Sequence, residues 1–296
     1  MEQVRERRST GTPESEETPP GGGAASVRLQ ATGGFSRTLA PSELWRYREL
    51  AGQIAVRDIT VRYRQTVLGA LWAVLQPVAT MVVFSIFFGR LAHVPSGGHS
   101  YPLFALAALV PWTFFANALL LGSDSLVSNA PLVSKVYFPR IFIPAGVIVA
   151  GLVDLAIAVV VLLVVVVAYG TSLSPDLLAL PGLTLIAVAS ALGVSSALSA
   201  LNVKYRDVRY VVPFLVQLWL FLTPVAYPIT LLHEPWRTVV AVNPMVGVVE
   251  GFRWAVLGGE AAPWTLIAVS ALSAALLFFA GLAYFDRVER GLADIL

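Results

Sequence analysis

Asp154 is the first candidate for chemistry, because it is an acidic residue inside a long apolar run. It lies roughly midway along residues 141–168, which are long and apolar enough to cross a membrane as one helix. A charge at that depth is costly and faces protein or water. Asp154 could relay protons or bind an ion, or it could pair with a neighbouring helix. We favour pairing, because an ion-coupled carrier usually has several such groups and we find one.

Glu250 and Arg253 are a second candidate pair. They lie three positions apart within a short apolar stretch, so they would share one face of a helix. They could pair with each other, or with a second copy of the chain, and hold an external gate shut. A solvated surface pair is the other interpretation.

The residues that soluble enzymes use are missing. There is no G-x-x-x-x-G-K-[ST] motif, so the chain cannot bind ATP through a P-loop. There is no cysteine, and the three histidines fall in predicted external loops. His93 and His99 share one such loop, and we attribute them to loop polarity rather than to a metal. No Ser-His-Asp or paired-carboxylate arrangement stands out, so we predict no catalytic residue, no metal and no cofactor in this chain.

The composition indicates a protein that a membrane surrounds. Of 296 residues, 57% are hydrophobic and only 13% are charged, whereas soluble domains average about 25% charged residues. The formal net charge of +2 is too small to indicate a nucleic-acid partner. We therefore predict an all-α polytopic protein of the cytoplasmic membrane.

Six apolar runs are long enough to be membrane-spanning helices, each needing about 20 residues. They form a predicted transmembrane domain over residues 65–296. Residues 42–64 place apolar residues at helical spacing with charges between them, which predicts an amphipathic interfacial helix. Residues 1–40 are polar and rich in Pro and Gly, which predicts a disordered cytoplasmic tail. The spans are 67–89, 103–121, 141–168, 177–201, 211–227 and 264–284.

The basic residues predict the orientation. Six crossings with a cytoplasmic N-terminus place most arginines and lysines inside, as the positive-inside rule requires, and both termini are then cytoplasmic. Only Arg90, Arg237 and Arg253 fall outside. The inside regions hold every arginine up to Arg64 and Lys135, Arg140, Lys204, Arg206, Arg209, Arg287 and Arg290.

Two regions fit neither a simple loop nor a span. Residues 129–140, on the inside, predict a short helix near Pro131–Tyr137 that Pro139 stops. Residues 229–263, on the outside, contain the apolar stretch Met245–Leu257, which is too short to cross and predicts a re-entrant or interfacial hairpin.

Aromatic residues gather at the ends of the spans, which is typical of an interfacial belt. Some could instead line a substrate pathway, because an aromatic face with a polar edge suits sugar rings. The candidates for the pathway are Trp112, Phe115, Trp219 and Tyr227.

Four ordered stretches resemble a known family. They read RDITVRYRQTVLGALWAVLQP (Arg57–Pro77), YPLFALAALVPWTFFANAL (Tyr101–Leu119), NAPLVSKVYFPR (Asn129–Arg140) and LNVKYRDVRY (Leu201–Tyr210). Together they are similar to the membrane subunits of type-2 ABC exporters for O-antigen, teichoic acid or capsule chains. The likeness runs from about Trp45 to Leu296.

The resemblance implies a homodimeric permease with two copies of a separate ATPase, which binds ATP and Mg. It implies that residues 129–140 hold the helix that docks on the ATPase, and that residues 229–263 hold external gate helices with Glu250 and Arg253. The candidates for coupling to the ATPase are Lys135, Tyr137, Arg140, Arg57, Asp58, Arg62 and Arg64.

We therefore expect export of a lipid-linked polysaccharide or related glycoconjugate. Within the same family the substrate could be a lipid or a drug. A secondary transporter that uses Asp154 and an ion gradient is the alternative from another class. A membrane-embedded glycan-processing enzyme would need a polar cluster at one leaflet, which we do not find.

Overall fold

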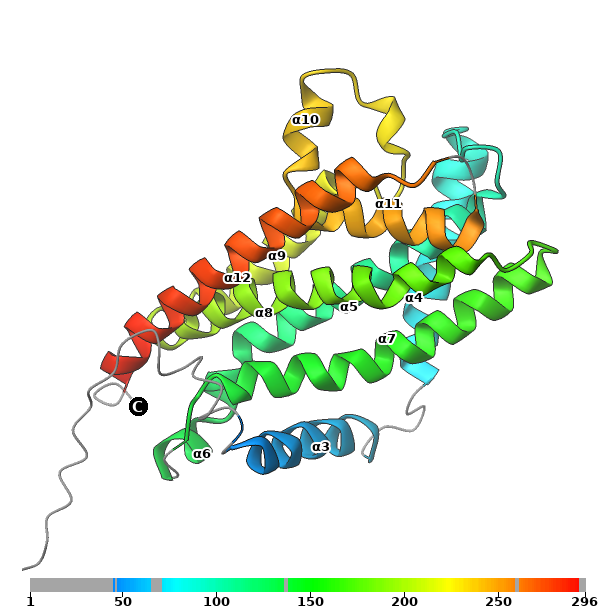
Figure 1. Ribbon diagram of the computed structural model, residues 1–296. Coiled ribbons are helices and arrows are strands. Elements are labelled where there is room, and N and C mark those ends of the chain that lie inside the picture. Colours follow the sequence, from blue (N-terminus) through cyan, green and yellow to red (C-terminus); the bar gives the residue numbers. More distant parts are fainter. Residues whose placement is uncertain (1–44, 46, 65–70, 136–137, 259–260, 293–296) are drawn as a thin grey trace, which may run out of the picture. The chain divides into compact units, whose positions relative to one another are not determined.

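The computed structural model describes residues 45, 47–64, 71–135, 138–258 and 261–292. Among these residues every regular element is a helix and none is a strand (Figure 1). The described residues all belong to one compact unit, Gly34–Leu296. The predicted tail 1–40, the first residues of the first predicted span, and Tyr137 lie outside the described residues.

Five helical stretches within the described residues are long and apolar enough to cross a membrane. The first is α4 (Leu71–Phe84), which continues as the π-helical η1 (Ser85–Leu91). The others are α5 (Tyr101–Ser128), α7 (Phe142–Ala168), η2 with α8 (Pro175–Ala179 and Leu180–Lys204), and α12 (Trp264–Leu292). They correspond to predicted spans one, two, three, four and six.

The fifth predicted span is shorter than expected. Helix α9 (Val208–Leu222) has 15 residues and ends five positions before Tyr227. A residue that precedes proline is disfavoured in the helical region, because the proline ring clashes with it. Thr223 precedes Pro224 and is extended, with φ −105° and ψ 133°, so the helix ends there.

Three short helices follow α9: η3 (Ile229–Leu231), α10 (Trp236–Ala241) and α11 (Pro244–Leu257). The boundaries of α11 confirm the limits expected for the short apolar stretch. The Asn243 side chain accepts a hydrogen bond from the N–H of Met245 and caps its start, and Gly258, with φ 72°, follows its last residue. Its side chains are buried rather than exposed, and it packs on α5, α8 and α12.

Helix α5 is the centre of the core, because it contacts α4, α7, α8, α9 and α11. A close helix crossing joins α8 and α12. A Cβ at Gly193 would lie 2.4 Å from the carbonyl oxygen of Leu277, and one at Gly281 would lie 2.0 Å from the carbonyl oxygen of Gly193. Both positions need glycine, as at other close crossings of membrane helices.

Helices α3 and α6 also lie outside the spans in the sequence. Helix α3 (Arg48–Arg64) packs along α7, and Ile54 and Ala55 are its buried residues. Helix α6 (Ala130–Lys135) follows α5 directly, within the predicted coupling region. Of the predicted apolar stripe on residues 42–64, Ile54 is buried but Val61 is 57% exposed.

Candidate functional site

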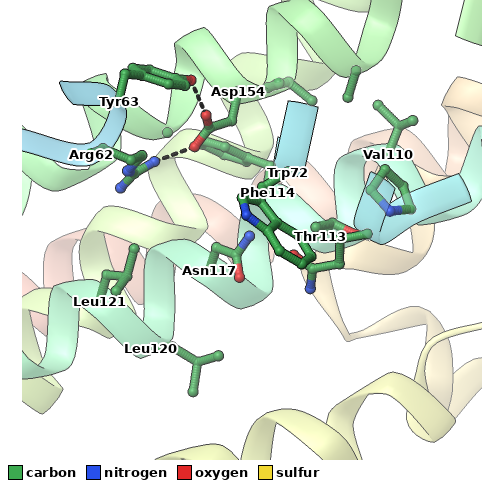
Figure 2. A pocket seen from close by; sticks show the side chains of 15 residues that line it. Arg62, Tyr63, Trp72, Val110, Thr113, Phe114, Asn117, Leu120, Leu121 and Asp154 are labelled. Carbon is green, nitrogen blue, oxygen red and sulfur yellow. Dashed lines mark hydrogen bonds and ion pairs between the residues drawn. The ribbon is translucent and has the colours of Figure 1, made fainter. Parts of the chain in front are cut away.

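Asp154 is paired, and its partners come from α3. Its carboxylate forms an ion pair with the guanidinium of Arg62 and accepts a hydrogen bond from the hydroxyl of Tyr63 (Figure 2). The side chains of Arg62 and Asp154 are 24% and 22% exposed. The last turn of α3 therefore supplies the cation that compensates the acidic residue of α7.

The contact between α3 and α7 extends along both helices. A Cβ at Gly146 would lie 2.8 Å from Cγ2 of Ile54, so the glycine lets α3 approach closely. About two helical turns further along each chain, Arg62 and Tyr63 meet Asp154. The two helices therefore run in the same direction, which gives α3 a longer contact than a single crossing would.

The environment of Tyr63 keeps its hydroxyl protonated. Burial, reinforced by the hydrogen bond to Asp154, raises the pKa of Tyr63 from 10 to about 12. The hydroxyl consequently remains a hydrogen-bond donor at any physiological pH.

A cavity of about 310 Å³ begins at this ion pair. It lies among α3, α4, α5 and α7, and its polar lining includes Gln76, Thr113 and Asn117 besides Arg62, Tyr63 and Asp154 (Figure 2). The cavity reaches the protein surface, because Trp72 is 53% and Leu121 is 48% exposed. The remaining lining is formed by Pro77, Val110, Phe114, Leu120, Gly151, Leu155 and Ala158.

Arg57 links α3 to the start of α6. Its guanidinium pairs with Asp58 at 2.8 Å and donates a hydrogen bond of 2.8 Å to Oδ1 of Asn129, the residue between α5 and α6. The Asn129 amide in turn donates to the carbonyl oxygen of Ser125. Arg64, the last residue of α3, is exposed.

Arg140 contacts the end of α12 in the described chain. Its backbone N–H donates to Oε1 of Glu289 at 3.2 Å, and its guanidinium donates to the carbonyl oxygen of Glu289 at 3.4 Å. Lys135 is the last residue of α6. The predicted coupling candidates therefore lie in different places: Arg62 pairs with Asp154, Arg57 contacts both Asp58 and Asn129, and Arg140 contacts α12.

Glu250 and Arg253 pair with each other inside one chain, at 3.0 Å. Arg253 is 5% exposed, and its guanidinium lies 3.6 Å from the ring of Phe104. It also donates to the carbonyl oxygens of Phe104, Val225 and Tyr227. A solvated surface pair is the wrong description, because the arginine is buried and joins α11, α5 and the segment after α9.

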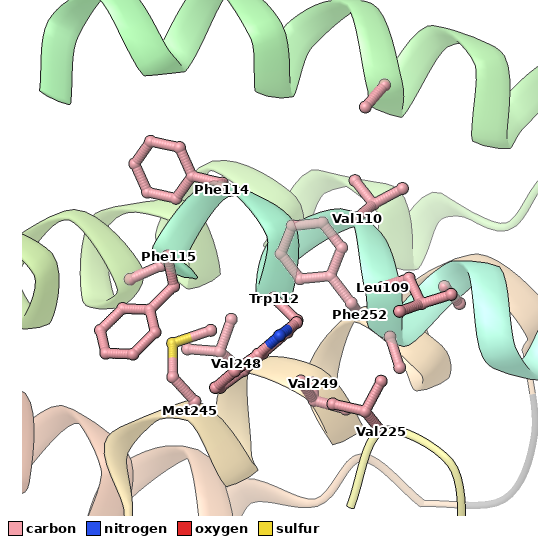
Figure 3. Close-up of a cluster of buried hydrophobic side chains, with 14 of the residues drawn as sticks. Leu109, Val110, Trp112, Phe114, Phe115, Val225, Met245, Val248, Val249 and Phe252 are labelled. Atoms are coloured by element: carbon pink, nitrogen blue, oxygen red, sulfur yellow. The ribbon is translucent and has the colours of Figure 1, made fainter. Parts of the chain in front are cut away.

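The four aromatic candidates for the substrate pathway differ in burial. Trp112 and Phe115 are buried in the core with Met245 and Phe252, so they do not belong to an interfacial belt (Figure 3). Trp219 packs edge-on against Phe115 and donates to Oδ1 of Asn243 at 3.0 Å. The side chains of Trp219 and Tyr227 are half-buried, in contrast to the two buried rings.

Several of these residues carry only a weak signal in the sequence. Tyr63 follows Arg62 directly but carries no charge, and Asn129 stands at a helix junction that the sequence places only approximately. Thr113 and Asn117 lie one turn apart on α5, and this polar spacing inside an apolar span was a signal that could have found them.

The geometry just described coincides with a family match. The sequence model of the family described as "ABC-2 type transporter" matches residues 50–257, which contain α5, α6, α7, α8, α9 and α11. A second likeness is to the O-antigen export system permease protein RfbA of Myxococcus xanthus, 31% identical over 253 residues, which are 83% of this chain and 95% of that protein.

Two further relatives align over similar lengths. The O-antigen export system permease protein RfbA of Klebsiella pneumoniae is 28% identical, over 82% of this chain and 93% of its own. The polysialic acid transport protein KpsM of Escherichia coli is 23% identical, over 80% and 92%. The family match covers more than half of the residues, and the first relative covers most of both chains. The chain is therefore a multi-pass membrane protein of the ABC-2 type transporter family.

Proposed function

We propose that this chain is the permease subunit of an ATP-driven exporter that moves a lipid-linked polysaccharide across the cytoplasmic membrane. The observation that carries this proposal is the alignment with O-antigen export permeases over more than four fifths of this chain and more than nine tenths of theirs. ATP and Mg bind a separate ATPase, two copies of which serve two copies of this chain. The chain itself transports and does not catalyse.

A deletion strain tests the export step. Without this chain, lipid-linked polysaccharide stays in the cytoplasmic leaflet, where an externally added glycosidase or periodate cannot reach it, and the wild-type gene restores access. Polysaccharide that still reaches the outside, together with a changed lipid or drug tolerance, would instead support the lipid or drug exporter. The ion-coupled carrier has less support, because Arg62 already compensates Asp154.

The proposed topology has six crossings with both termini in the cytoplasm, and α9 provides the fifth. Its 15 residues span about 22 Å, less than the roughly 30 Å of the hydrocarbon core. The segment after it extends the path without helical hydrogen bonds. Irregular backbone at membrane depth needs partners within the protein. Arg253 and Tyr101 supply them to the carbonyl oxygens of Val225 and Ala226.

The length of α7 supports a cytoplasmic position for α3. Its 27 residues span about 40 Å, roughly 10 Å more than the hydrocarbon core. If the excess projects into the cytoplasm, Asp154 lies about 8 Å inside the core rather than at its midplane. A long arginine side chain reaches such a depth from the interface. Helix α3 then enters the headgroup region at a tilt.

We place the docking of the ATPase on α6, with α3 moving alongside it. The supporting contact is Arg57 to Asn129, which joins the two helices. Lys135→Glu should abolish co-purification with the ATPase and leave the thermal unfolding of the permease unchanged. Arg140→Glu should also abolish co-purification with the ATPase. It should additionally lower the stability of the permease, because the new carboxylate would lie beside Glu289. Normal assembly of Lys135→Glu would contradict this assignment, and Arg237→Glu on α10 is the control.

The second moving part of the transporter in this proposal is α11, at the external end. Glu250 and Arg253 fix α11 to α5 and to the segment after α9 within one protomer. The gate therefore opens by movement of the whole unit between copies, with this pair intact. Crosslinks that fix α11 to its counterpart should stop export, while Glu250→Gln should reduce stability before it changes export.

A further inference from the structure

Three polar side chains line the cavity beside Asp154 without a hydrogen-bond partner among the described residues. Gln76, Thr113 and Asn117 make no side-chain hydrogen bond to any other part of the described chain. Such groups in membrane-spanning helices are normally satisfied by neighbouring helices, because lipid tails offer no partner. Their common cavity supplies the place where a ligand could satisfy them.

The charges that line the cavity disfavour an anionic ligand. Its one cation, among the described lining residues, is Arg62, and Asp154 compensates it directly. An anion would meet the carboxylate of Asp154 without a free positive charge to balance it. Amides and a hydroxyl both donate and accept, so they match the hydroxyl groups of an uncharged ligand.

The rest of the lining favours a ligand with an apolar part. Trp72 presents a broad ring at the open side, and Leu120, Leu121 and Leu155 offer aliphatic walls. Pockets of about 300 Å³ and above are large enough for small-molecule groups. A sugar ring stacks its apolar face on an indole and turns its hydroxyls to the amides, while an attached lipid chain lies along the leucines.

We propose that this cavity is a binding site for the uncharged sugar headgroup of a lipid. The site lies within a single copy of the chain, so it needs no second copy to form. It rests on the proposed export function for the choice of a glycolipid as ligand. A binding assay without the ATPase measures lipid binding to this cavity directly. A negative binding result is therefore distinct from a failure of the proposed export function.

The experiment compares two lipids that differ only in the sugar. The full-length protein is purified in polyoxyethylene detergent and mixed with monoglucosyl diacylglycerol or with diacylglycerol of the same chains. Native mass spectrometry then counts the lipids that stay bound. We expect about tenfold more retained glucosyl lipid, the effect of one or two hydrogen bonds to the sugar. Equal retention of the two lipids would overturn the proposal.

Variants locate the binding. Asn117→Leu combined with Thr113→Val should reduce glucosyl-lipid retention about fivefold or more. Trp72→Leu, at a position that is 53% exposed, should reduce it about threefold. Gln217→Leu, an exposed polar residue of α9 outside the cavity, is the matched control and should change nothing. Unchanged retention in both cavity variants would also overturn the proposal.

Two competitors distinguish the possible sources of the headgroup. Methyl glucoside at millimolar concentration should displace little glucosyl lipid, because it lacks the chain that the leucines hold. Phosphatidylglycerol should compete poorly, because its phosphate meets a carboxylate. Displacement by phosphatidylglycerol at equal concentration would show an anion site and contradict the proposal.

Discussion

Replacing Asp154 by asparagine tests whether this carboxylate holds α3 on α7. The change leaves the guanidinium of Arg62 without its anion at a site where both side chains are about three quarters buried. An exposed pair contributes at most about 1 kcal/mol. Breaking a fully buried pair costs about 3–5 kcal/mol. Asp154→Asn should therefore cost about 2 kcal/mol, which is about a thirtyfold loss in the docking equilibrium of α3.

Spin labels can measure this docking, because the chain has no cysteine and only introduced thiols react. Suitable positions are Val56 on α3 and Val149 on α7, which are 62% and 46% exposed. The parent pair should give one narrow distance distribution, and Asp154→Asn should broaden it. Adding Arg62→Gln to Asp154→Asn should recover part of the loss, because no charge is then left unpaired.

Asp154 does not hold α3 on α7 if Asp154→Asn leaves the label distances and the thermal unfolding unchanged. If that variant also loses transport, Asp154 acts on an ion and the secondary-transporter interpretation gains support. If the losses from Arg62→Gln and Asp154→Asn simply add, the two residues do not form an energetically coupled pair.

Three further changes test other contacts. Gly193→Ala should lower the thermal unfolding temperature by several degrees, because its Cβ would clash with the α12 backbone, whereas Gly182→Ala on the same helix meets nothing and should not. Arg253→Gln should cost about 3 kcal/mol, because it leaves an acid and three carbonyl groups without their partner; Arg237→Gln on exposed α10 is the control, and equal unfolding temperatures would contradict this role. Because the pKa of Tyr63 is raised to about 12, its contribution is complete below pH 10 and is lost between pH 10 and 12. The spin-label distance should therefore stay constant from about pH 6 to about pH 9, and a change within that range would show that another group titrates.

The sequence predicted the helical class and the long spans, because an apolar run is a local property and a bilayer fixes its length. It also predicted the limits of the apolar stretch Met245–Leu257, which α11 matches to within one residue, because Asn243, Pro244 and Gly258 are local signals. The end of α9 was misplaced because the hydropathy of residues 223–227 outweighed the signal from Pro224. A conformational preference, not hydrophobicity, ends this helix.

The site was harder to predict, because its partners are distant in the sequence. A paired Asp154 was the favoured interpretation, but nothing local connects it to Arg62, and the sequence assigned that arginine to the ATPase surface. Similarly, Arg253 was expected at an external gate, and the carbonyl groups that it binds leave no trace in residue type. The cavity also depends on four helices together, so no single segment encodes it.

The glycine crossing of α8 and α12 has a consequence for biogenesis. Among the described helices α12 is the last to be synthesised, and α8 emerges from the ribosome well before it. Until α12 inserts, the flat face around Gly193 lacks its counterpart, so lipid or an insertion chaperone has to cover it. A chain that stops before α12 therefore lacks the helix that covers this surface. The packing of α8 against α12 is consequently completed only after α12 has been synthesised.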